Sequence, residues 1–239
     1  MNAIEIKNLS KQYKTFKLDN VSFNVEEGHI VGFVGRNGAG KTTTIKSILN
    51  IVKKNSGNVK FFGLDLEENE NIIKNKIGFS SGTTNYYPRK KLIDIINITK
   101  TFYNNWDDTI MEEYINLFQL DLSKTPSELS EGMKVKFNLL LALSHHAKVL
   151  ILDEPTSGLD PFSRDEILEV FIELKKRGTA ILFSTHITSD LEKCADDIVY
   201  IRKGKIVSAC SKTDFMQKYQ LNDETLENII LRLERENHD

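Results

Sequence analysis

The segment from Gly35 to Thr42 reads Gly-Arg-Asn-Gly-Ala-Gly-Lys-Thr, and it restricts the possible folds more than any other part of the sequence. Four residues separate Gly35 from Gly40, which is the spacing of a phosphate-binding P-loop. The apolar run of residues 30–34 predicts a buried strand before the loop. A predicted helix follows it, and the apolar residues at the spacing of one helix face are Ile45, Ile48, Leu49 and Val52. The predicted order is therefore strand, loop and helix, as nucleotide binding requires.

The residues of this loop have separate expected tasks. The glycines allow backbone N–H groups to point inward at phosphate oxygens, and the helix that begins near Lys41 adds the positive end of its dipole. Lys41 should reach the β and γ phosphates, and the Thr42 hydroxyl is suited to ligate Mg²⁺. We expect these residues of the loop at the nucleotide: Gly35, Asn37, Gly38, Ala39, Gly40, Lys41, Thr42 and Thr43.

Composition narrows the class of protein. The 239 residues suffice for one large α/β domain or for a domain with a smaller lobe. The net charge is −2, so an overall basic surface for nucleic acid is not expected. The two cysteines, Cys194 and Cys210, lie far apart, which favours a reduced cytosolic compartment. No segment approaches the ~20 apolar residues of a membrane span, so any membrane role should come through a partner.

The order of the other expected elements indicates an α/β fold with an inserted helical lobe. Polar and apolar residues alternate near Ile4 and over residues 21–25, which is typical of half-buried antiparallel strands. Apolar runs that are typical of buried strands occur at 59–62, 77–79, 149–152 and 180–183. A polar loop is expected at 80–84 and a hairpin at 198–209, and the pattern is helical from about 92 to 147 and around 226–233.

Two carboxylates follow the apolar run 149–152. Asp153 and Glu154 lie at the C-terminal end of a predicted buried parallel strand, where ligand sites of α/β sheets form. Asp153 is placed to hold Mg²⁺, directly or through water, and Glu154 is placed to orient or deprotonate a water that attacks the γ-phosphate. The alternative is that both acids cap a helix, and the next helix is expected to begin at Pro161.

Three further candidates stand outside these two motifs. His186 follows the strand at 180–183, so it should reach the same edge of the sheet. Tyr13 precedes the P-loop strand, and its ring is suited either to stack on adenine or to pack on the sheet. Ser130 and the backbone N–H of Gly132 lie at the expected start of a helix, which fits an anion site and equally an ordinary N-cap.

These segments together resemble the nucleotide-binding subunit of ATP-binding cassette (ABC) transporters over essentially the whole chain. The matching motifs are Walker A at 35–42, the family signature at 129–133, Walker B at 149–154, the D-loop at 157–160, the switch histidine His186 and the adenine-stacking Tyr13. The resemblance implies an ATPase in which Glu154, His186 and Lys41 are catalytic. It also implies that Thr42 and Asp153 hold Mg²⁺ beside ATP.

The resemblance also implies a fold. The expected architecture is a P-loop NTPase core with a mainly parallel sheet, an N-terminal antiparallel β subdomain and an inserted α-helical subdomain. We assign residues 1–82 and 148–239 to the RecA-like core with its antiparallel β part, and residues 83–147 to the helical subdomain that carries the signature. All three segments belong to a single ABC ATPase domain over residues 1–239.

Partners follow from the same resemblance. The family forms a head-to-tail dimer that holds two ATP molecules, each between the P-loop of one copy and Ser130, Gly132 and Asp160 of the other. Removal of the bridging γ-phosphate by hydrolysis opens the dimer. A membrane permease inserts coupling helices near residues 80–110, so the chain is expected in the cytoplasm against the inner face of the membrane. The second cassette is either an identical copy or a paralogue, and nucleic acid is not expected as a partner.

This sequence departs from the family at two places. Glu131 and Met133 replace the usual glycine and glutamine of the signature, although Ser130 and Gly132 remain. Gly82 stands where the family has a glutamine that touches Mg²⁺ and senses the permease, so the hydroxyl of Ser80 or Ser81 is the nearest candidate oxygen.

The function that we predict is ATP-driven export of peptides or drugs through a separate permease. The signature form Leu-Ser-x-Gly-Met, the segment 102–107 and the C-terminal helix resemble bacterial exporter cassettes. Two alternatives stay open at this point. One is a soluble ABC ATPase that acts on ribosomes or nucleic acid, and the other is a regulatory ATP-binding module with little hydrolysis.

Overall fold

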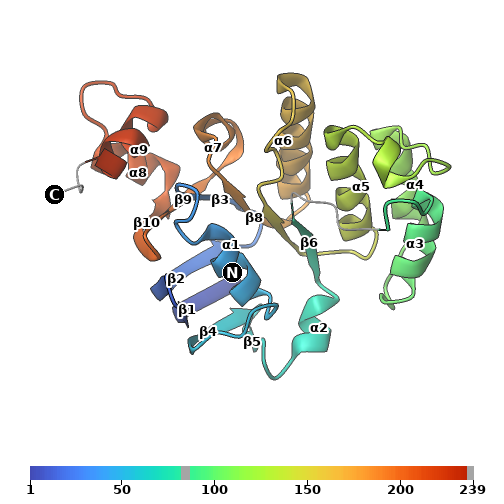
Figure 1. Cartoon of the computed structure of the whole chain (residues 1–239), viewed down its shortest axis with the longest axis horizontal. Coiled ribbons are helices and arrows are strands. Elements are labelled where there is room, and N and C mark those ends of the chain that lie inside the picture. The colour runs from blue at the N-terminus through green and yellow to red at the C-terminus, as the bar shows by residue number, and fades with distance from the viewer. Residues whose placement is uncertain (82–86, 236–239) are drawn as a thin grey trace.

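A computed structural model of the chain describes residues 1–81 and 87–235, which form two β-sheets covered by helices (Figure 1). The larger sheet has six strands in the order β10-β9-β3-β8-β7-β6. All neighbouring pairs are parallel except β10 with β9. Its strands are β3 (Ile30–Val34), β6 (Ile77–Ser81), β7 (Val149–Asp153), β8 (Ala180–Thr185), β9 (Asp197–Arg202) and β10 (Lys205–Ser211).

The smaller sheet is antiparallel and has the order β2-β1-β4-β5. Its strands are β1 (Asn2–Gln12), β2 (Lys17–Glu26), β4 (Ser56–Phe61) and β5 (Leu64–Asp65). The predicted alternation is confirmed, since Val21, Phe23 and Val25 are buried while their neighbours face outward. The prediction that Phe62 belongs to the strand is wrong, because the strand ends at Phe61 and Phe62 turns the chain with a φ of 51°.

Each face of the six-stranded sheet carries its own apolar core. The continuous apolar run of β7 is explained by this arrangement, because Leu150 and Leu152 pack on one face while Val149 and Ile151 pack on the other. Helix α1 (Lys41–Ile48) lies with the smaller sheet on one side. The helix is shorter than predicted: Leu49 caps it, and Val52 lies beyond its end.

The inserted helical lobe consists of α3 (Leu92–Lys100), α4 (Asp108–Phe118), the 3-10 turn η1 (Pro126–Glu128) and α5 (Glu131–Leu143). The predicted helical pattern is confirmed, and the buried side chains include Tyr114 and Phe118 of α4 and Phe137 of α5. Ser80 and Ser81, predicted in a loop, extend β6. The boundary between residues 82 and 83, and Gly82 itself, lie outside the described residues, so the division into subdomains stays a prediction.

The remaining helices complete the cover of the larger sheet. Four of them are α2 (Glu70–Lys74), α6 (Pro161–Lys176), α7 (Thr188–Cys194) and α8 (Lys212–Tyr219), and the last is α9 (Leu226–Arg235). Helix α6 begins at Pro161 as predicted, and α9 buries the predicted Leu226, Ile229 and Ile230. Helices α8 and α9 lie at the opposite end of the molecule from α3 and α4 (Figure 1).

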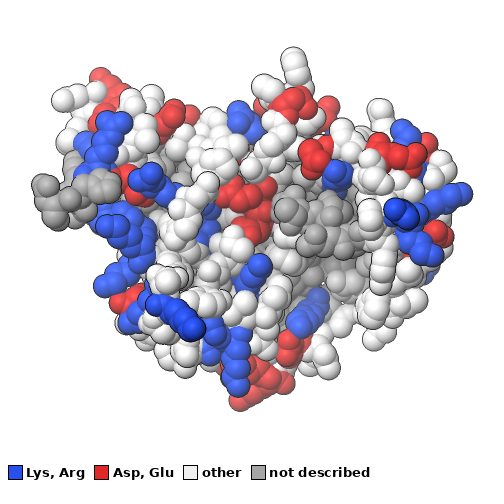
Figure 2. All heavy atoms as spheres, in the orientation of Figure 1, with Lys and Arg blue, Asp and Glu red and all other residues white. Residues whose placement is uncertain are grey.

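Surface charge is mixed in sign on the face that Figure 2 shows, where Lys and Arg are interspersed with Asp and Glu. This distribution agrees with the net charge of −2. Within residues 1–81 and 87–235, no helix combines the length and the apolar character that crossing a bilayer demands.

Candidate nucleotide-binding site

Three loops meet at one edge of the six-stranded sheet, because the strand order places β8 between β3 and β7. Val34 lies opposite Thr185, and Ser184 lies opposite Asp153. The P-loop after β3, the acidic pair after β7 and His186 after β8 therefore emerge side by side. Ligand sites of α/β sheets form at such carboxyl ends of strands.

The P-loop ends at Gly40, from which α1 begins. Gly40 has a φ of 115°, and a Cβ atom there would lie 2.8 Å from the Phe16 ring and from Leu18. A larger residue is therefore excluded by both conformation and space. The Lys41 side chain folds back over the loop, and its Nζ donates a hydrogen bond of 2.7 Å to the Gly35 carbonyl. This contact holds a buried ammonium group at the edge of the site.

Glu154 lies between Lys41 and His186, and its carboxylate contacts both side chains. Its Oε1 is 3.1 Å from Lys41 Nζ, and its Oε2 is 2.8 Å from His186 Nδ1. The Glu154 backbone is left-handed, with a φ of 53°, which is strained for a residue with a side chain. The Ser184 hydroxyl accepts a hydrogen bond of 3.0 Å from the Glu154 N–H and helps to hold this conformation.

A cavity of about 750 Å³ opens over these groups. Predicted site residues that line it are Tyr13, Asn37, Gly38, Gly40, Lys41, Thr42, Thr43, Glu154 and His186. Gly35, Ala39 and Asp153 lie behind this lining, Gly35 with its carbonyl on Lys41. Four lining residues were missed as site residues: Thr15, Phe16, Arg36 and Ser157. For Phe16 a signal was present, because it is an aromatic residue three positions after Tyr13 in the same turn, where the Tyr13 N–H donates to its carbonyl.

The oxygen atoms near the cavity fit a hard cation such as Mg²⁺. Asp153 is 8% exposed and accepts a hydrogen bond of 2.6 Å from Ser184 through Oδ1, which leaves Oδ2 for another partner. Thr42 faces the cavity, and Ser81 of β6 lies opposite Asp153 in the sheet. In the described ranges no group of three or more His, Cys, Asp and Glu side chains could hold a metal. The few oxygen ligands offered by Asp153, Thr42 and Ser81 suit Mg²⁺, because this ion keeps several waters and takes substrate phosphates as ligands.

None of the three residues predicted to act on a second copy lines the cavity. Ser130 and Gly132 lie at the start of α5, and Asp160 lies at the start of α6. Ser130 caps α5, and its Oγ accepts a hydrogen bond of 3.3 Å from the Met133 N–H. A Cβ atom on Gly132 would lie 3.0 Å from the Ser163 side chain, so the signature contacts the first turn of α6. Asp160 caps α6, and hydrogen bonds from the Ser163 hydroxyl and from backbone N–H groups hold the pKa of its carboxyl below the usual value.

A family model described as ABC transporter matches residues 18–157. The chain belongs to the ABC transporter family. It is 33% identical over 249 aligned residues to a bacitracin transport ATP-binding protein of Bacillus licheniformis, covering 99% of this chain and 80% of that one. A lantibiotic transport ATP-binding protein of Streptococcus pyogenes is 34% identical, with 85% and 89% covered. A solved ATP-binding subunit of an ABC transporter is 28% identical with a TM-score of 0.88, covering 98% of this chain and all of that chain. The predicted ABC cassette fold is confirmed.

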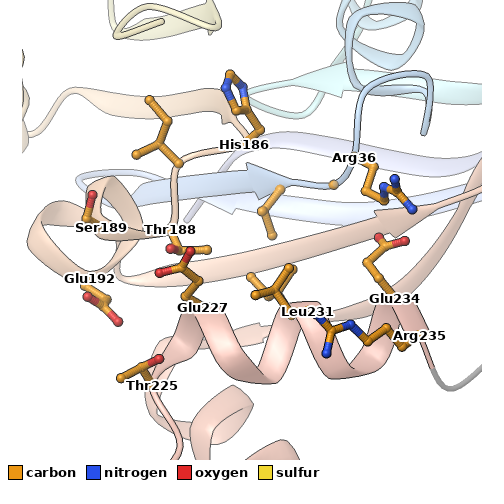
Figure 3. A pocket seen from close by; sticks show the side chains of 14 residues that line it. Arg36, His186, Thr188, Ser189, Glu192, Thr225, Glu227, Leu231, Glu234 and Arg235 are labelled. Atoms are coloured by element: carbon orange, nitrogen blue, oxygen red, sulfur yellow. The ribbon is translucent and has the colours of Figure 1, made fainter.

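A second cavity of about 730 Å³ adjoins the first in this ABC cassette, and the two share Arg36 and His186. It lies between the His186 loop, α7 and α9 (Figure 3). Arg36 of the P-loop and Glu234 of α9 point toward one another there. Glu234 also accepts a hydrogen bond of 2.8 Å from the Tyr200 hydroxyl, which fixes the end of α9 beside the P-loop.

Proposed function

We propose that this chain binds ATP with Mg²⁺ in the first cavity and hydrolyses it. The observation that carries the proposal is the contact of Glu154 with both Lys41 and His186 at the mouth of a P-loop. Lys41 would exchange its ion pair with Glu154 for contacts with the phosphates of ATP, because phosphate oxygens compete with the carboxylate for the same ammonium group. Glu154 is then released to accept a proton from water.

Thr42 and Asp153 would hold Mg²⁺. The ion would supply positive charge that neutralises the phosphate oxygens as the γ-phosphate is transferred. The Thr42 hydroxyl and the second oxygen of Asp153 are the donors offered by the chain itself. Ser81, next to Asp153 in the sheet, is a candidate to replace the glutamine oxygen that Gly82 cannot provide.

His186 orients Glu154. Since the carboxylate accepts a hydrogen bond at Oε2, the proton lies on Nδ1 of the imidazole, and Nε2 is left toward the cavity. The strained backbone of Glu154 adds to this preorganisation, because the carboxylate is held before substrate arrives. These contacts support a role for Glu154 as the base that would accept a proton from the attacking water.

A second cassette, either an identical copy or a paralogue, would complete the catalytic site. Ser130, the N–H of Gly132 and Asp160 lie outside the cavity of their own chain and at helix starts, where anions are stabilised. A head-to-tail dimer would bring them to the partner's ATP. Hydrolysis would then remove the contact that holds the dimer closed.

Export of peptides or drugs through a membrane permease is the proposed transport function. Support comes from relatives whose names give bacitracin and lantibiotic transport. The chain would work in the cytoplasm, bound to the inner face of the membrane through the permease.

Two measurements test these proposals. Purified chain should release phosphate from ATP only when Mg²⁺ is present, and lack of release would favour a regulatory ATP-binding module. Isolation from detergent-solubilised membranes should recover a permease with several membrane spans. Recovery only in the soluble fraction with ribosomes or DNA would contradict a role in transport.

A further inference from the structure

Asp190 of α7 carries a carboxylate that the binding site does not use. Among the described Asp and Glu residues it is the one with no exposed surface, and it lines neither of the two cavities described above. Burial raises the pKa of this carboxyl, whereas the Thr156 hydroxyl and then the charge of Arg164 act in the opposite direction. A buried carboxylate destabilises a protein unless its neighbours compensate for the lost water, so its contacts should indicate its role.

These contacts come from both loops of the proposed catalytic pair. Asp190 Oδ2 accepts a hydrogen bond of 2.6 Å from the Thr156 hydroxyl and a longer one of 3.4 Å from the Thr185 hydroxyl. Thr156 lies two residues after Glu154, and Thr185 immediately precedes His186. One oxygen atom therefore joins the turn that carries the base to the turn that carries the histidine.

The other oxygen, Oδ1, faces α6. Arg164 Nε lies 3.4 Å from it, as an ion pair without hydrogen-bond geometry. Since Thr156 precedes the turn at 157–160 and Arg164 follows it, Asp190 pins that turn at both ends. The neighbouring Ser189 and Glu192 of α7 face the second cavity (Figure 3), so the helix presents Asp190 inward and these two residues outward.

We infer that Asp190 is a positioning residue for ATP hydrolysis, holding the Glu154 and His186 loops at the separation that brings those two side chains into contact. This inference rests on the proposed function. The two hydrogen bonds from Thr156 and Thr185 to Asp190 form a clamp between the loops. The Thr185 hydroxyl also accepts a hydrogen bond of 2.9 Å from the Ile187 N–H, so the clamp fixes the backbone on both sides of His186. Without the clamp the two loops are joined by fewer contacts, and the 2.8 Å approach of Glu154 to His186 is no longer enforced.

Replacing Thr156 tests the clamp with little change of volume. Thr156→Val removes the hydroxyl, whereas Thr156→Ser keeps it. We expect the valine variant and Asp190→Asn to lower kcat for Mg–ATP about 10- to 100-fold, as a misplacement of about 1 Å does, with little change in KM. The serine variant should keep the wild-type kcat.

Asp165→Asn is the matched control. Asp165 of α6 forms an exposed ion pair of 2.5 Å with Lys193 of α7, so it links the same two helices without touching either loop. Its loss should leave kcat unchanged. A variant that fails to fold would be recognised by its thermal unfolding curve. In that case the kcat values of Thr156→Val and Thr185→Val are compared with the wild-type value, because each variant removes one hydroxyl from the same carboxylate.

A second readout separates positioning from a general structural role. In a Glu154→Gln background, Asp190→Asn should cause no further loss of rate, because its effect acts through the base. Additive losses would overturn the inference, as would a wild-type kcat in Thr156→Val or a parallel loss in Thr156→Ser. Absence of phosphate release from the wild-type chain would refute the proposed function as well, and it would be seen before any variant is compared.

Discussion

The P-loop cavity and the start of α5 are both proposed to bind phosphate, yet they differ in how many contacts their side chains make within the chain. At the cavity, side chains from three loops contact one another, because the Glu154 carboxylate interacts with both Lys41 and His186. At the start of α5, Ser130 contacts only its own helix through Met133 N–H. In the proposed function, the core therefore carries the groups for binding and proton transfer, while the helical lobe supplies donors for the ATP of a second cassette.

This difference follows from the chain's topology. Adjacent parallel strands bring the cavity loops together, whereas the lobe is inserted between β6 and β7 and ends with the helix that carries Ser130. A site divided in this way, as we propose, would couple chemistry to association, because each half would need the other for hydrolysis. Changes on the two sides should accordingly have different signatures.

Lys41→Met should have the largest effect, since it removes the charge that both binding and the transition state require. We expect kcat/KM for ATP to fall about 10³-fold or more, as two charge-assisted interactions are lost. Equilibrium binding of Mg–ATP and phosphate release would measure it. Lys46→Met, on an exposed position of the same helix, is the control. Normal ATP affinity in Lys41→Met would contradict the proposed role of Lys41 in binding the phosphates of ATP.

Glu154→Gln should separate binding from chemistry within the core. The amide keeps the shape but is no longer a base, so kcat should fall about 10²- to 10⁴-fold while ATP still binds. Tight binding with very slow phosphate release in a single-turnover measurement is the expected result. Turnover close to wild type would mean that another group activates the water.

Ser130→Ala examines the helical side alone. It should lower phosphate release about 10- to 100-fold through loss of one hydrogen bond to a charged phosphate, with ATP binding to the monomer unchanged. Its stability loss should be about 1 kcal/mol. Ser211→Ala is the matched control, because Ser211 caps α8 by the same contact, 3.0 Å to Asp214 N–H, far from the site. Equal rates for the two variants would contradict a role for Ser130 beyond capping.

Tyr13→Ala should affect affinity and leave the chemistry intact. Tyr13 lines the cavity and is 39% exposed, so its ring is available to a base. Loss of stacking at about 1 to 3 kcal/mol should raise the Kd for ATP roughly tenfold, with kcat preserved and with Tyr13→Phe close to wild type. An unchanged Kd would favour a purely structural tyrosine, and Phe16 would become the next residue to replace.

His145→Phe should have the smallest effect, on stability in acid. The ring is buried and stacked on Tyr103 with centroids 3.9 Å apart, and burial lowers its pKa below the ordinary value. The unfolded chain then binds a proton first, so stability is full above the ordinary pKa and falls as the pH drops toward the folded pKa, by at most about 1.4 kcal/mol per pH unit. Chemical unfolding at several pH values should show this slope in the wild type and in Tyr103→Phe, but reduced in His145→Phe. An equal slope in His145→Phe would assign it to other groups.

The P-loop and the acidic pair were predictable because each depends on residues close in sequence. Helix α1 begins and strand β7 lies where their apolar patterns predict, since a periodic or continuous apolar run encodes its own element. Helices α2, α7 and α8 were not predicted: they span five, seven and eight residues, and no motif marks their positions as the P-loop marks the start of α1. Asp190 was missed for another reason: its importance lies in its contact with Thr156, which is distant in the sequence.

The sequence by itself predicted the chemistry that we propose for this protein: a phosphate loop, a metal-binding carboxylate and a base, each encoded by a few neighbouring residues. Only the tertiary structure decided which of these groups meet. Lys41 lies more than a hundred residues before Glu154, and His186 lies 32 residues after it. Both side chains nevertheless reach Glu154, because β8 lies between β3 and β7. It also decided that Ser130 lies outside that cavity, since the hydrogen-bonded order of strands, unlike local periodicity, depends on the packing of the whole chain.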